Sequence, residues 1–425
     1  MTSRKLLSLT ALISLAILAL LSIGLMIPLR VPMSHNDSPN DALFYATRGP
    51  HPVGVLALKK IGEAELEVTM WYPALDDGDS QAKITYAYEM KVGGPVGAFT
   101  LATFAGQALH DAPYDRTPGP YPLVILSPGF AIGSSAYAWL AEHLASYGFV
   151  VIAPEHQEQL DGELNGLWQG AILRPQEIQT VLAYIDEQAS PGHMLEGLVD
   201  AETLAVIGHS YGGYTALAAG GARIDTVSFQ ALCQAAYKSN EPGAWLCDEL
   251  LPHLPDMAAL AGLDAVPDGL WQPTWLDSRV DAIVSMAGDA FFFGQQGLAD
   301  ITAPVMAIGG TLDTDAPYMW GTYPTYEYAS SKTKVRIALL DAEHMIFTGP
   351  CESIPLLLRF VSDEFCADSG WNRDDAHALV RHFTAAFLLY TLKNDHLAHE
   401  TLLPDAATQF TGIKYSTTLG KDDGP

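Results

Sequence analysis

Ser210 stands in a sequence context that suits a nucleophile. It is the central residue of Gly208-His209-Ser210-Tyr211-Gly212, which fits the pattern G-x-S-x-G. The preceding apolar run, residues 204–208, predicts a buried strand, and the small residues that follow favour a helix packed closely against a sheet. A sharp turn between such a strand and helix exposes the serine hydroxyl at the tip of the strand. We therefore predict a nucleophilic serine here rather than an ordinary strand-to-helix turn.

A serine hydroxyl becomes a good nucleophile when a base takes its proton, and the base is usually a histidine oriented by a carboxylate. After a turn of this kind, the carboxylate and then the histidine follow in the chain, each beyond a strand. His344 comes directly after the last predicted strand, and Asp313 follows the strand before it. We predict His344 as the base and Asp313 as the acid. Asp315 is the close competitor, because one turn can present either carboxylate, and Asp289, after the preceding strand, is a further alternative.

Attack on a carbonyl group creates an oxyanion that needs two preorganised hydrogen-bond donors. The backbone N–H of Tyr211, directly after the nucleophile, is one candidate. The other is the N–H of Phe130, which follows a Pro-Gly turn just beyond a predicted strand. His156, after the next strand, could border the same site, whereas His209 is expected to serve packing and hydrogen bonding.

Apolar runs of strand length alternate with helical patterns through most of the chain. Eight strands are predicted, at residues 52–58, 65–72, 121–126, 149–153, 204–208, 280–287, 304–309 and 334–340. This alternation is typical of a mostly parallel α/β sheet with helices on both faces, in which the first two strands pair antiparallel at one edge. Residues 76–120 are expected to form a loop with a short helix near 96–109, and Pro175 is expected to open a helix.

Residues 222–278 interrupt the alternation and are rich in proline and tryptophan. They predict an insertion of short helices over the sheet. This insertion is either a lid or a purely structural excursion.

The N-terminus carries Arg4 and Lys5, followed by an uncharged apolar stretch from Leu6 to Ile27 that is long enough to span a bilayer. Residues 1–30 are therefore predicted to be a transmembrane anchor or a signal segment, with the uncleaved anchor favoured. The expected location is outside the cytoplasm, held to the membrane by this helix, or secreted or periplasmic if the helix is cleaved. The predicted divisions that follow are a linker at 31–48, the main domain at 49–395 and a loosely held polar tail at 396–425.

The charge of the chain excludes some classes of binding partner, and its cysteines predict disulfides. The chain has 49 acidic and 22 basic residues, and the net charge of −27 argues against binding to nucleic acid or to anionic lipid through a basic patch. Cys233, Cys247, Cys351 and Cys366 allow three pairings, and an exported protein favours disulfides. The local pairs Cys233–Cys247 and Cys351–Cys366 are the simplest prediction, and four free buried thiols are the alternative. The predicted chemistry requires neither a metal nor an organic cofactor.

Four segments together carry a family resemblance: Val124 to Phe130, Trp139 to His156, Arg174-Pro175 and Ala205 to Gly213. Through them the chain resembles the exported, predicted dienelactone hydrolase branch of the α/β-hydrolases. That branch is similar to the plasma-type platelet-activating-factor acetylhydrolases and, more distantly, to cutinase-like polyester hydrolases. The resemblance runs from about Gly49 to Leu392.

The resemblance implies the α/β-hydrolase fold and esterase activity. It also places Ser210, Asp313 and His344 at the triad positions, and Phe130 and Tyr211 at the oxyanion positions. True dienelactone hydrolases use a cysteine nucleophile, so serine here puts lactone specificity in doubt. Many relatives have His-Gly where this chain has Pro128-Gly129, a difference that favours bulky esters.

The sequence thus predicts a serine carboxylic-ester hydrolase that forms an acyl-enzyme with short or hydrophobic esters. A phospholipase A2 like the platelet-activating-factor acetylhydrolases, or a polyester or lipid hydrolase, is the alternative within the enzymes, and a peptidase is another. A non-catalytic binding module built on the same fold is the alternative from a different class. The expected partner is a small-molecule or lipid ester.

Overall fold

The computed structural model describes residues 41–61, 65–75, 83–93, 97–158, 166–272, 274–355, 358 and 365–420. The predicted anchor or signal segment, residues 1–30, lies outside these ranges, and so does most of the predicted linker. Within the described ranges, no helix is both long enough and apolar enough to cross a membrane.

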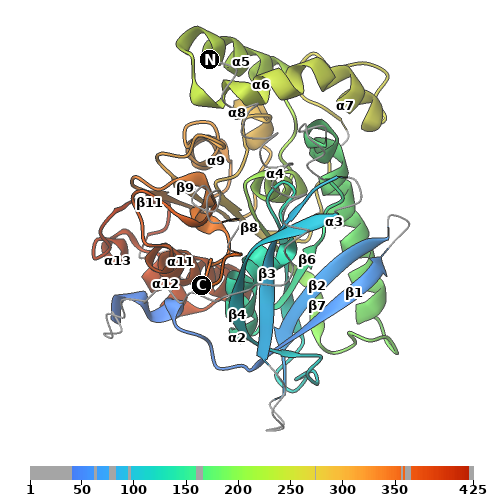
Figure 1. The fold of residues 1–425 in the computed structure, drawn as a ribbon, viewed down its shortest axis with the longest axis vertical. Coiled ribbons are helices and arrows are strands. Elements are labelled where there is room, and N and C mark those ends of the chain that lie inside the picture. The colour runs from blue at the N-terminus through green and yellow to red at the C-terminus, as the bar shows by residue number, and fades with distance from the viewer. Residues whose placement is uncertain are drawn as a thin grey trace.

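One mixed sheet runs through the described part of the molecule, with eleven strands in the spatial order β11-β10-β9-β8-β7-β5-β6-β2-β1-β4-β3 (Figure 1). The strands are β1 (Val53–Ile61), β2 (Leu66–Pro73), β3 (Lys83–Lys91), β4 (Ala98–His110), β5 (Tyr121–Ser127), β6 (Val150–Pro154), β7 (Val199–His209), β8 (Val280–Met286), β9 (Val305–Gly310), β10 (Lys334–Leu339) and β11 (Ile413–Thr417). Parallel pairing runs from β6 through β5, β7, β8 and β9 to β10. β1 and β2 pair antiparallel, as predicted, but they do not form the edge of the sheet, because β4 and β3 lie beyond β1. The predicted mostly parallel α/β-hydrolase sheet is confirmed, and all eight predicted strands are present.

The region expected to be a loop with a short helix is instead two strands, β3 and β4, which pair antiparallel beyond β1. The helix predicted near 96–109 is therefore wrong. β4 buries Phe104, Gly106 and Ala108, while Ala105 and Gln107 between them are exposed. This alternation is the mark of a strand. Alanine, glycine and glutamine have little preference for strands, so the pattern is weak in the sequence.

The C-terminal segment is not loosely held where the structure describes it, which corrects the expectation for residues 396–425. The short helices α12 (His396–Thr401) and α13 (Pro404–Ala407) lead into β11. β11 pairs antiparallel with β10, from Ile413 opposite Leu339 to Thr417 opposite Val335. The backbone groups of an edge strand accept such a partner whatever its side chains are, so a polar segment can be held firmly.

Helices cover both faces of the sheet (Figure 1). α2 (Ala138–Ser146) and α11 (Arg373–Lys393) share one core cluster with Val124 of β5, whereas α3 (Leu167–Ala189) and α4 (Tyr211–Ala219) share the other with Leu123. Neighbouring residues of one strand point to opposite faces, so β5 contributes to both cores. The other α-helices of the described residues are α5 (Thr226–Ser239), α6 (Trp245–Leu250), α7 (Leu254–Leu260), α8 (Gly294–Leu298) and α9 (Thr322–Tyr328).

α3 begins at Leu167, so Pro175 lies inside the helix and does not open it, contrary to the prediction. Proline has no N–H and leaves the carbonyl four residues earlier without its helical donor. That carbonyl belongs to Ala171, and the hydroxyl of Tyr214 in α4 donates to it at 2.7 Å. The hydroxyl of Tyr211 donates to the carbonyl of Leu167 at 2.5 Å. These two bonds fasten α3 to the helix that follows Ser210.

Residues 222–278 hold the short helices α5, α6 and α7, which gather at one end of the molecule in Figure 1. A disulfide between Cys233 and Cys247 joins α5 to α6, with the Cα atoms 5.6 Å apart. The ring of His253 stacks on Trp168 of α3, with the ring centroids 5.2 Å apart. The segment thus packs against α3, and its role as a lid stays a prediction.

Candidate active site

Ser210 lies between β7 and α4, at the tip of a central strand. Its backbone has φ 56° and ψ −123°, which a residue other than glycine adopts only where the surroundings impose it. The N–H of Ser210 donates to the carbonyl of Met286 at 2.9 Å. A Cβ at Gly208 would clash with the backbone of Gly212, and a Cβ at Gly212 would clash with the carbonyl oxygen of Ser127. The two glycines of the motif therefore permit the close approach that this turn requires.

His344 and Asp313 meet Ser210 in one hydrogen-bonded chain. His344 opens the short 3₁₀ helix η6 (His344–Phe347) beyond β10, and its Nε2 lies 2.9 Å from Ser210 Oγ. Its Nδ1 lies 2.7 Å from Asp313 Oδ2. The other carboxylate oxygen of Asp313 accepts hydrogen bonds from the N–H groups of Asp315, at 2.9 Å, and Ala316, at 2.8 Å. The loop therefore aims one oxygen of Asp313 at the imidazole.

The charges around His344 favour its protonated form. Burial alone would lower the pKa of His344, but the charge and hydrogen bond of Asp313, together with the charges of Asp315 and Asp289, raise it above the ordinary value. The imidazolium is the species that forms when a histidine takes the proton of a serine. This surrounding therefore stabilises the product of the proton transfer.

The three candidate acids occupy different surroundings. Asp313 is 6% exposed and bonded to His344, whereas the side chain of Asp315 is exposed and only its backbone N–H contacts Asp313. Asp289 is 5% exposed, and its Oδ1 has no hydrogen-bond partner in the described part of the chain. Burial raises the pKa of Asp289 to about 7, although the charge of His344 opposes the shift. The geometry therefore favours Asp313 as the partner of the histidine.

Phe130 and Tyr211, the predicted oxyanion donors, lie together. Their rings meet edge to face, with the centroids 6.1 Å apart. In the part of the chain that the structure describes, neither backbone N–H donates to a protein acceptor. Both groups are thus free to bind an oxygen of another molecule.

Two further histidines lie close by in supporting positions. His209 has its Nδ1 2.8 Å from the hydroxyl of Tyr137 and its Nε2 3.2 Å from the carbonyl oxygen of His344. Burial keeps its pKa well below the ordinary value, so it stays neutral. His209 thus serves packing and hydrogen bonding, as predicted, and it also supports the turn that holds His344. His156 bridges Ser127 Oγ, at 2.8 Å, and Glu177 Oε2, at 2.5 Å. It is 2% exposed and lies behind the turn that leads to Phe130.

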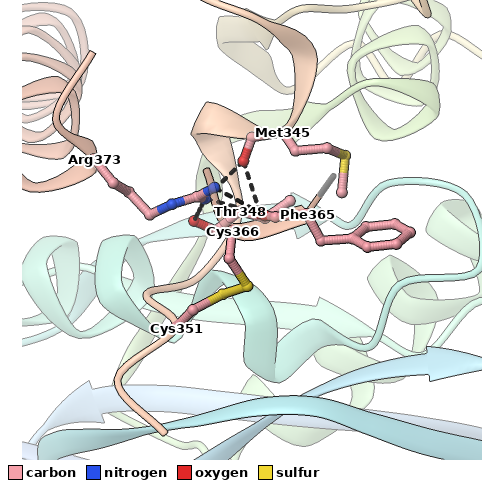
Figure 2. The surroundings of a disulfide bond; sticks show 6 residues. All are labelled: Met345, Thr348, Cys351, Phe365, Cys366 and Arg373. Carbon is pink, nitrogen blue, oxygen red and sulfur yellow. Dashed lines mark hydrogen bonds between the residues drawn. A yellow bond between two sulfur atoms is a disulfide. The ribbon is translucent and has the colours of Figure 1, made fainter. Parts of the chain in front are cut away.

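A disulfide and an arginine brace the segment after His344 (Figure 2). Cys351 pairs with Cys366, which with Cys233–Cys247 confirms the predicted local pairing. Arg373 Nη1 donates to the carbonyls of Met345, at 2.6 Å, and Thr348, at 2.8 Å, and Nη2 donates to the carbonyl of Phe365 at 2.8 Å. Phe365 precedes Cys366, so Arg373 connects the histidine-bearing turn to the disulfide loop.

The sequence predicts no role for Arg373, for the buried Arg174 or for Glu158, whose side chain is 7% exposed. The signal for Arg174 was its place in the Arg-Pro pair of the family resemblance. Arg373 and Glu158 carry no local signal, because their contacts join segments far apart in the chain.

A cavity of about 220 Å³ lies between the insertion and the loops after β8 and β9. Most of its lining is apolar or aromatic, and includes Leu232, Ala290, Phe291, Met319, Trp320 and Tyr323. Ala290 directly follows Asp289, whose N–H donates to the carbonyl of Ser210 at 3.4 Å. The segment after β8 thus contacts the Ser210 turn and also lines the cavity, although none of the predicted catalytic or oxyanion residues is among the lining residues. Among the described residues, no group of three or more histidine, cysteine or acidic side chains is arranged to hold a metal ion.

The fold and the Ser-His-Asp arrangement define an α/β-hydrolase. Two family models match parts of the chain, chlorophyllase over residues 111–235 and platelet-activating factor acetylhydrolase, isoform II, over residues 43–161. The predicted resemblance to the acetylhydrolase-like branch is thereby confirmed.

Similar proteins include several cutinases. Cutinase 1 of Thermobifida cellulosilytica is 30% identical over 275 residues, which cover 63% of this chain and 78% of the relative. Cutinase est1 of Thermobifida alba is 27% identical over 259 residues, which cover 59% of this chain and 64% of the relative. The match to cutinase est2 of the same organism covers 30% of that relative. Bis(hydroxyethyl) terephthalate hydrolase of Streptomyces coelicolor is 30% identical over 169 residues, which cover 40% of this chain and 47% of the relative. The chain belongs to the α/β-hydrolase family that includes cutinase 1.

Proposed function

We propose that the protein is a serine carboxylic-ester hydrolase. One observation carries the proposal: hydrogen bonds run without interruption from Asp313 through His344 to Ser210. Ser210 lies in the turn between β7 and α4, where its backbone has a positive φ. The family relationship supports it, because the similar proteins are named as cutinases and as a bis(hydroxyethyl) terephthalate hydrolase. The proposal assigns no step to a metal or an organic cofactor.

In the proposed reaction, Ser210 Oγ attacks the ester carbonyl while His344 Nε2 takes its proton. The carbonyl oxygen becomes an oxyanion and accepts hydrogen bonds from the N–H groups of Phe130 and Tyr211. The ester C–O bond then breaks, and His344 returns the proton to the leaving alcohol. Water repeats the sequence on the acyl-enzyme, with His344 again as the base, and releases the acid and Ser210.

The proposed substrates are short or hydrophobic esters. The mostly apolar lining of the cavity supports this choice, because Phe291 and Trp320 offer aromatic surface to a nonpolar group. The strongly negative chain also favours neutral over anionic esters.

Labelling with a fluorophosphonate probe, followed by mass spectrometry, tests the proposal. The phosphorus should be bonded to Ser210 Oγ, and labelling should fall by orders of magnitude in His344→Ala. Circular dichroism of that variant checks that it is folded. A folded wild-type protein that takes no label and hydrolyses none of a panel of p-nitrophenyl esters would favour the non-catalytic binding module instead.

A phospholipase A2 activity is the second candidate, favoured by the match to the acetylhydrolase family over residues 43–161. The discriminating measurement is hydrolysis of phosphatidylcholines whose sn-2 acyl chain increases from acetyl upwards, beside p-nitrophenyl esters of the same acids. Higher kcat/KM on the phospholipids would establish this candidate, and no hydrolysis of any phospholipid in the series would remove it.

We also propose that the protein is exported and anchored in the membrane by its apolar stretch from Leu6 to Ile27. The two disulfides support export, since they persist in oxidising compartments. Fractionation of expressing cells, with the N-terminal mass of the product, tests the anchor. A product that begins after residue 27 and stays in the soluble fraction would show that the segment is cleaved.

A further inference from the structure

Arg174 in α3 contacts both parts of the proposed oxyanion site. The residue is 0% exposed. Its Nη1 donates to the carbonyl of Pro128 at 2.7 Å, and its Nη2 donates to the carbonyl of Gly129 at 3.1 Å. Its guanidinium lies over the ring of Tyr211, 5.2 Å from the centroid. One side chain therefore reaches the turn that carries Phe130 and the residue that follows Ser210.

Glu158 binds both Arg174 and the turn that carries Phe130. It forms an ion pair with Arg174 Nη2, and its Oε1 accepts a hydrogen bond from the N–H of Ala131 at 3.4 Å. Burial alone would raise the pKa of Glu158, but the charge of Arg174 lowers it, so the carboxylate stays ionised. Buried charges persist when they are paired and hydrogen-bonded, and here both are bonded to the same turn.

The hydrogen bonds of this turn leave one donor free. The N–H of Gly129 donates to the hydroxyl of Tyr137 at 3.0 Å, and the N–H of Ile132 donates to the carbonyl of Gly129 at 3.2 Å. The N–H of Ala131 is bound by Glu158. Of the N–H groups from residue 129 to residue 132, all of which the structure describes, only that of Phe130 has no protein acceptor.

Arg174 also sets the direction of that free donor. The peptide bond between Gly129 and Phe130 is trans, so its C=O and N–H point in opposite directions. Because the carbonyl of Gly129 is held on the guanidinium, the N–H of Phe130 must point away from Arg174. Rotation of this peptide would break the bond to Arg174 and leave a buried cation with fewer acceptors.

We propose that Arg174, paired with Glu158, is a positioning residue that holds the N–H of Phe130 in the orientation that binds the oxyanion. This inference rests on the proposed ester hydrolysis. Arg174 touches none of the reacting atoms and acts through the peptide between Gly129 and Phe130. Its loss should weaken binding of the transition state and leave binding of the ground-state ester almost unchanged.

Two variants separate this role from simple stability. Arg174→Lys keeps the charge beside Glu158, but an ammonium cannot reproduce the two-pronged geometry of the guanidinium. The double variant Arg174→Met/Glu158→Leu removes both charges, so no buried charge is left unpaired. We expect kcat to fall about tenfold in the first and about 10²-fold in the second, with KM changed by less than about threefold. Titration with the fluorophosphonate probe gives the concentration of active sites for each kcat.

A pair of ketones provides a readout that a structural role would not move. Ser210 Oγ adds to the carbonyl of a trifluoromethyl ketone, its proton passes to His344, and the carbonyl oxygen becomes an oxyanion without loss of a leaving group. The matching methyl ketone binds without this step. We expect Ki for the trifluoromethyl ketone to rise by the same factor as kcat/KM falls, while Ki for the methyl ketone stays constant.

Arg116→Met is the matched control. Arg116 also donates hydrogen bonds to two carbonyls, of Met194 at 2.8 Å and Glu196 at 3.0 Å, and lies over the ring of Tyr114. It precedes β5, however, and so lies at the end of that strand away from Ser210. It should keep wild-type kcat and wild-type ketone affinities. Unchanged kcat and trifluoromethyl ketone affinity in folded Arg174 variants would overturn the inference and leave the hydrolase proposal standing. A wild-type protein that hydrolyses no ester would overturn both.

Discussion

Asp313 and Asp289 are two buried carboxyl groups beyond neighbouring strands, and their surroundings give them different chemistry. Asp313 accepts hydrogen bonds from two backbone N–H groups and from His344. Asp289 has an unpartnered oxygen in the described structure and a pKa that burial raises to about 7. Of the two carboxyl groups, only that of Asp313 is hydrogen-bonded to the histidine.

Replacement of Asp313 by asparagine should therefore lower kcat by about 10³- to 10⁴-fold, because the imidazolium loses its partner and the wrong tautomer is favoured. Asp289→Asn and Asp315→Asn should each lower kcat by less than about tenfold, since neither side chain bonds His344. Steady-state kinetics on one p-nitrophenyl ester measures all three. An equal or larger loss in Asp289→Asn would transfer the role of the acid to Asp289.

The charges around His344 also predict the pH dependence of the reaction. The base must be neutral to accept the serine proton, so kcat/KM should rise with pH as His344 loses its proton. Its pKa lies above the ordinary value of about 6.5, and the midpoint of the rise should do so too. Asp315→Asn removes one negative charge that raises this pKa and should move the midpoint to lower pH. Asp264→Asn, in the insertion, is the matched control, and an equal shift in both variants would contradict the assignment.

At the scale of elements, the turn that carries His344 is short and depends on neighbours distant in sequence. η6 spans only His344–Phe347, and Arg373 at the start of α11 holds the carbonyls of Met345 and Thr348. The same guanidinium holds the carbonyl of Phe365 beside the Cys351–Cys366 disulfide (Figure 2). The position of the base is thus coupled to the disulfide loop.

Opening of this disulfide should loosen the turn and lower activity. Cys351 and Cys366 are half-buried, whereas Cys233 and Cys247 are 0% exposed, so a mild reductant should open the first pair before the second. In Cys351→Ser/Cys366→Ser we expect kcat to fall roughly three- to tenfold, because a small displacement of His344 weakens proton transfer.

Cys233→Ala/Cys247→Ala is the matched variant for that experiment. Its disulfide closes a loop of similar length, and its loss should cost on the order of 2–4 kcal/mol of stability. Its kcat should remain close to that of the wild type. Differential alkylation identifies the disulfide that opens. A loss of kcat found only in Cys233→Ala/Cys247→Ala would contradict the coupling between His344 and the Cys351–Cys366 loop.

At the scale of the whole molecule, the net charge of −27 surrounds the site with negative potential. At low salt, kcat/KM should be lower for an ester with an anionic acyl group than for its neutral analogue of equal size. Added sodium chloride should narrow that difference, because ions screen the repulsion. Measurement of both esters over a salt series checks this, and equal salt responses would show that the site is shielded from the overall charge.

Features of the sequence that span only a few residues determined the Ser210 turn, the eight predicted strands and the disulfide pairs. The glycines around Ser210 permit one kind of turn, the apolar runs predict the eight strands that order the site, and cysteines close in sequence pair with each other. These features depend on residues a few positions apart, so the chain states them directly. The placement of His344 and Asp313 after successive strands also follows, because parallel strands bring their carboxyl ends to one edge of the sheet.

Tertiary structure decided the rest, because the remaining features depend on contacts between distant segments. The sequence favours Asp313 over Asp289, but only the folded chain shows that Asp313 bonds His344 while an oxygen of Asp289 has no partner among the described residues. β4 is a strand through its pairing with β3 and β1, since the alanine, glycine and glutamine in it have little preference for strands, and the five-residue β11 is held by its pairing with β10. Arg174, eight residues into α3, gains its place from two carbonyls beyond β5 and a glutamate beyond β6. These contacts of Arg174 cannot be predicted from spacing in the sequence, because they form only when α3 packs against the sheet.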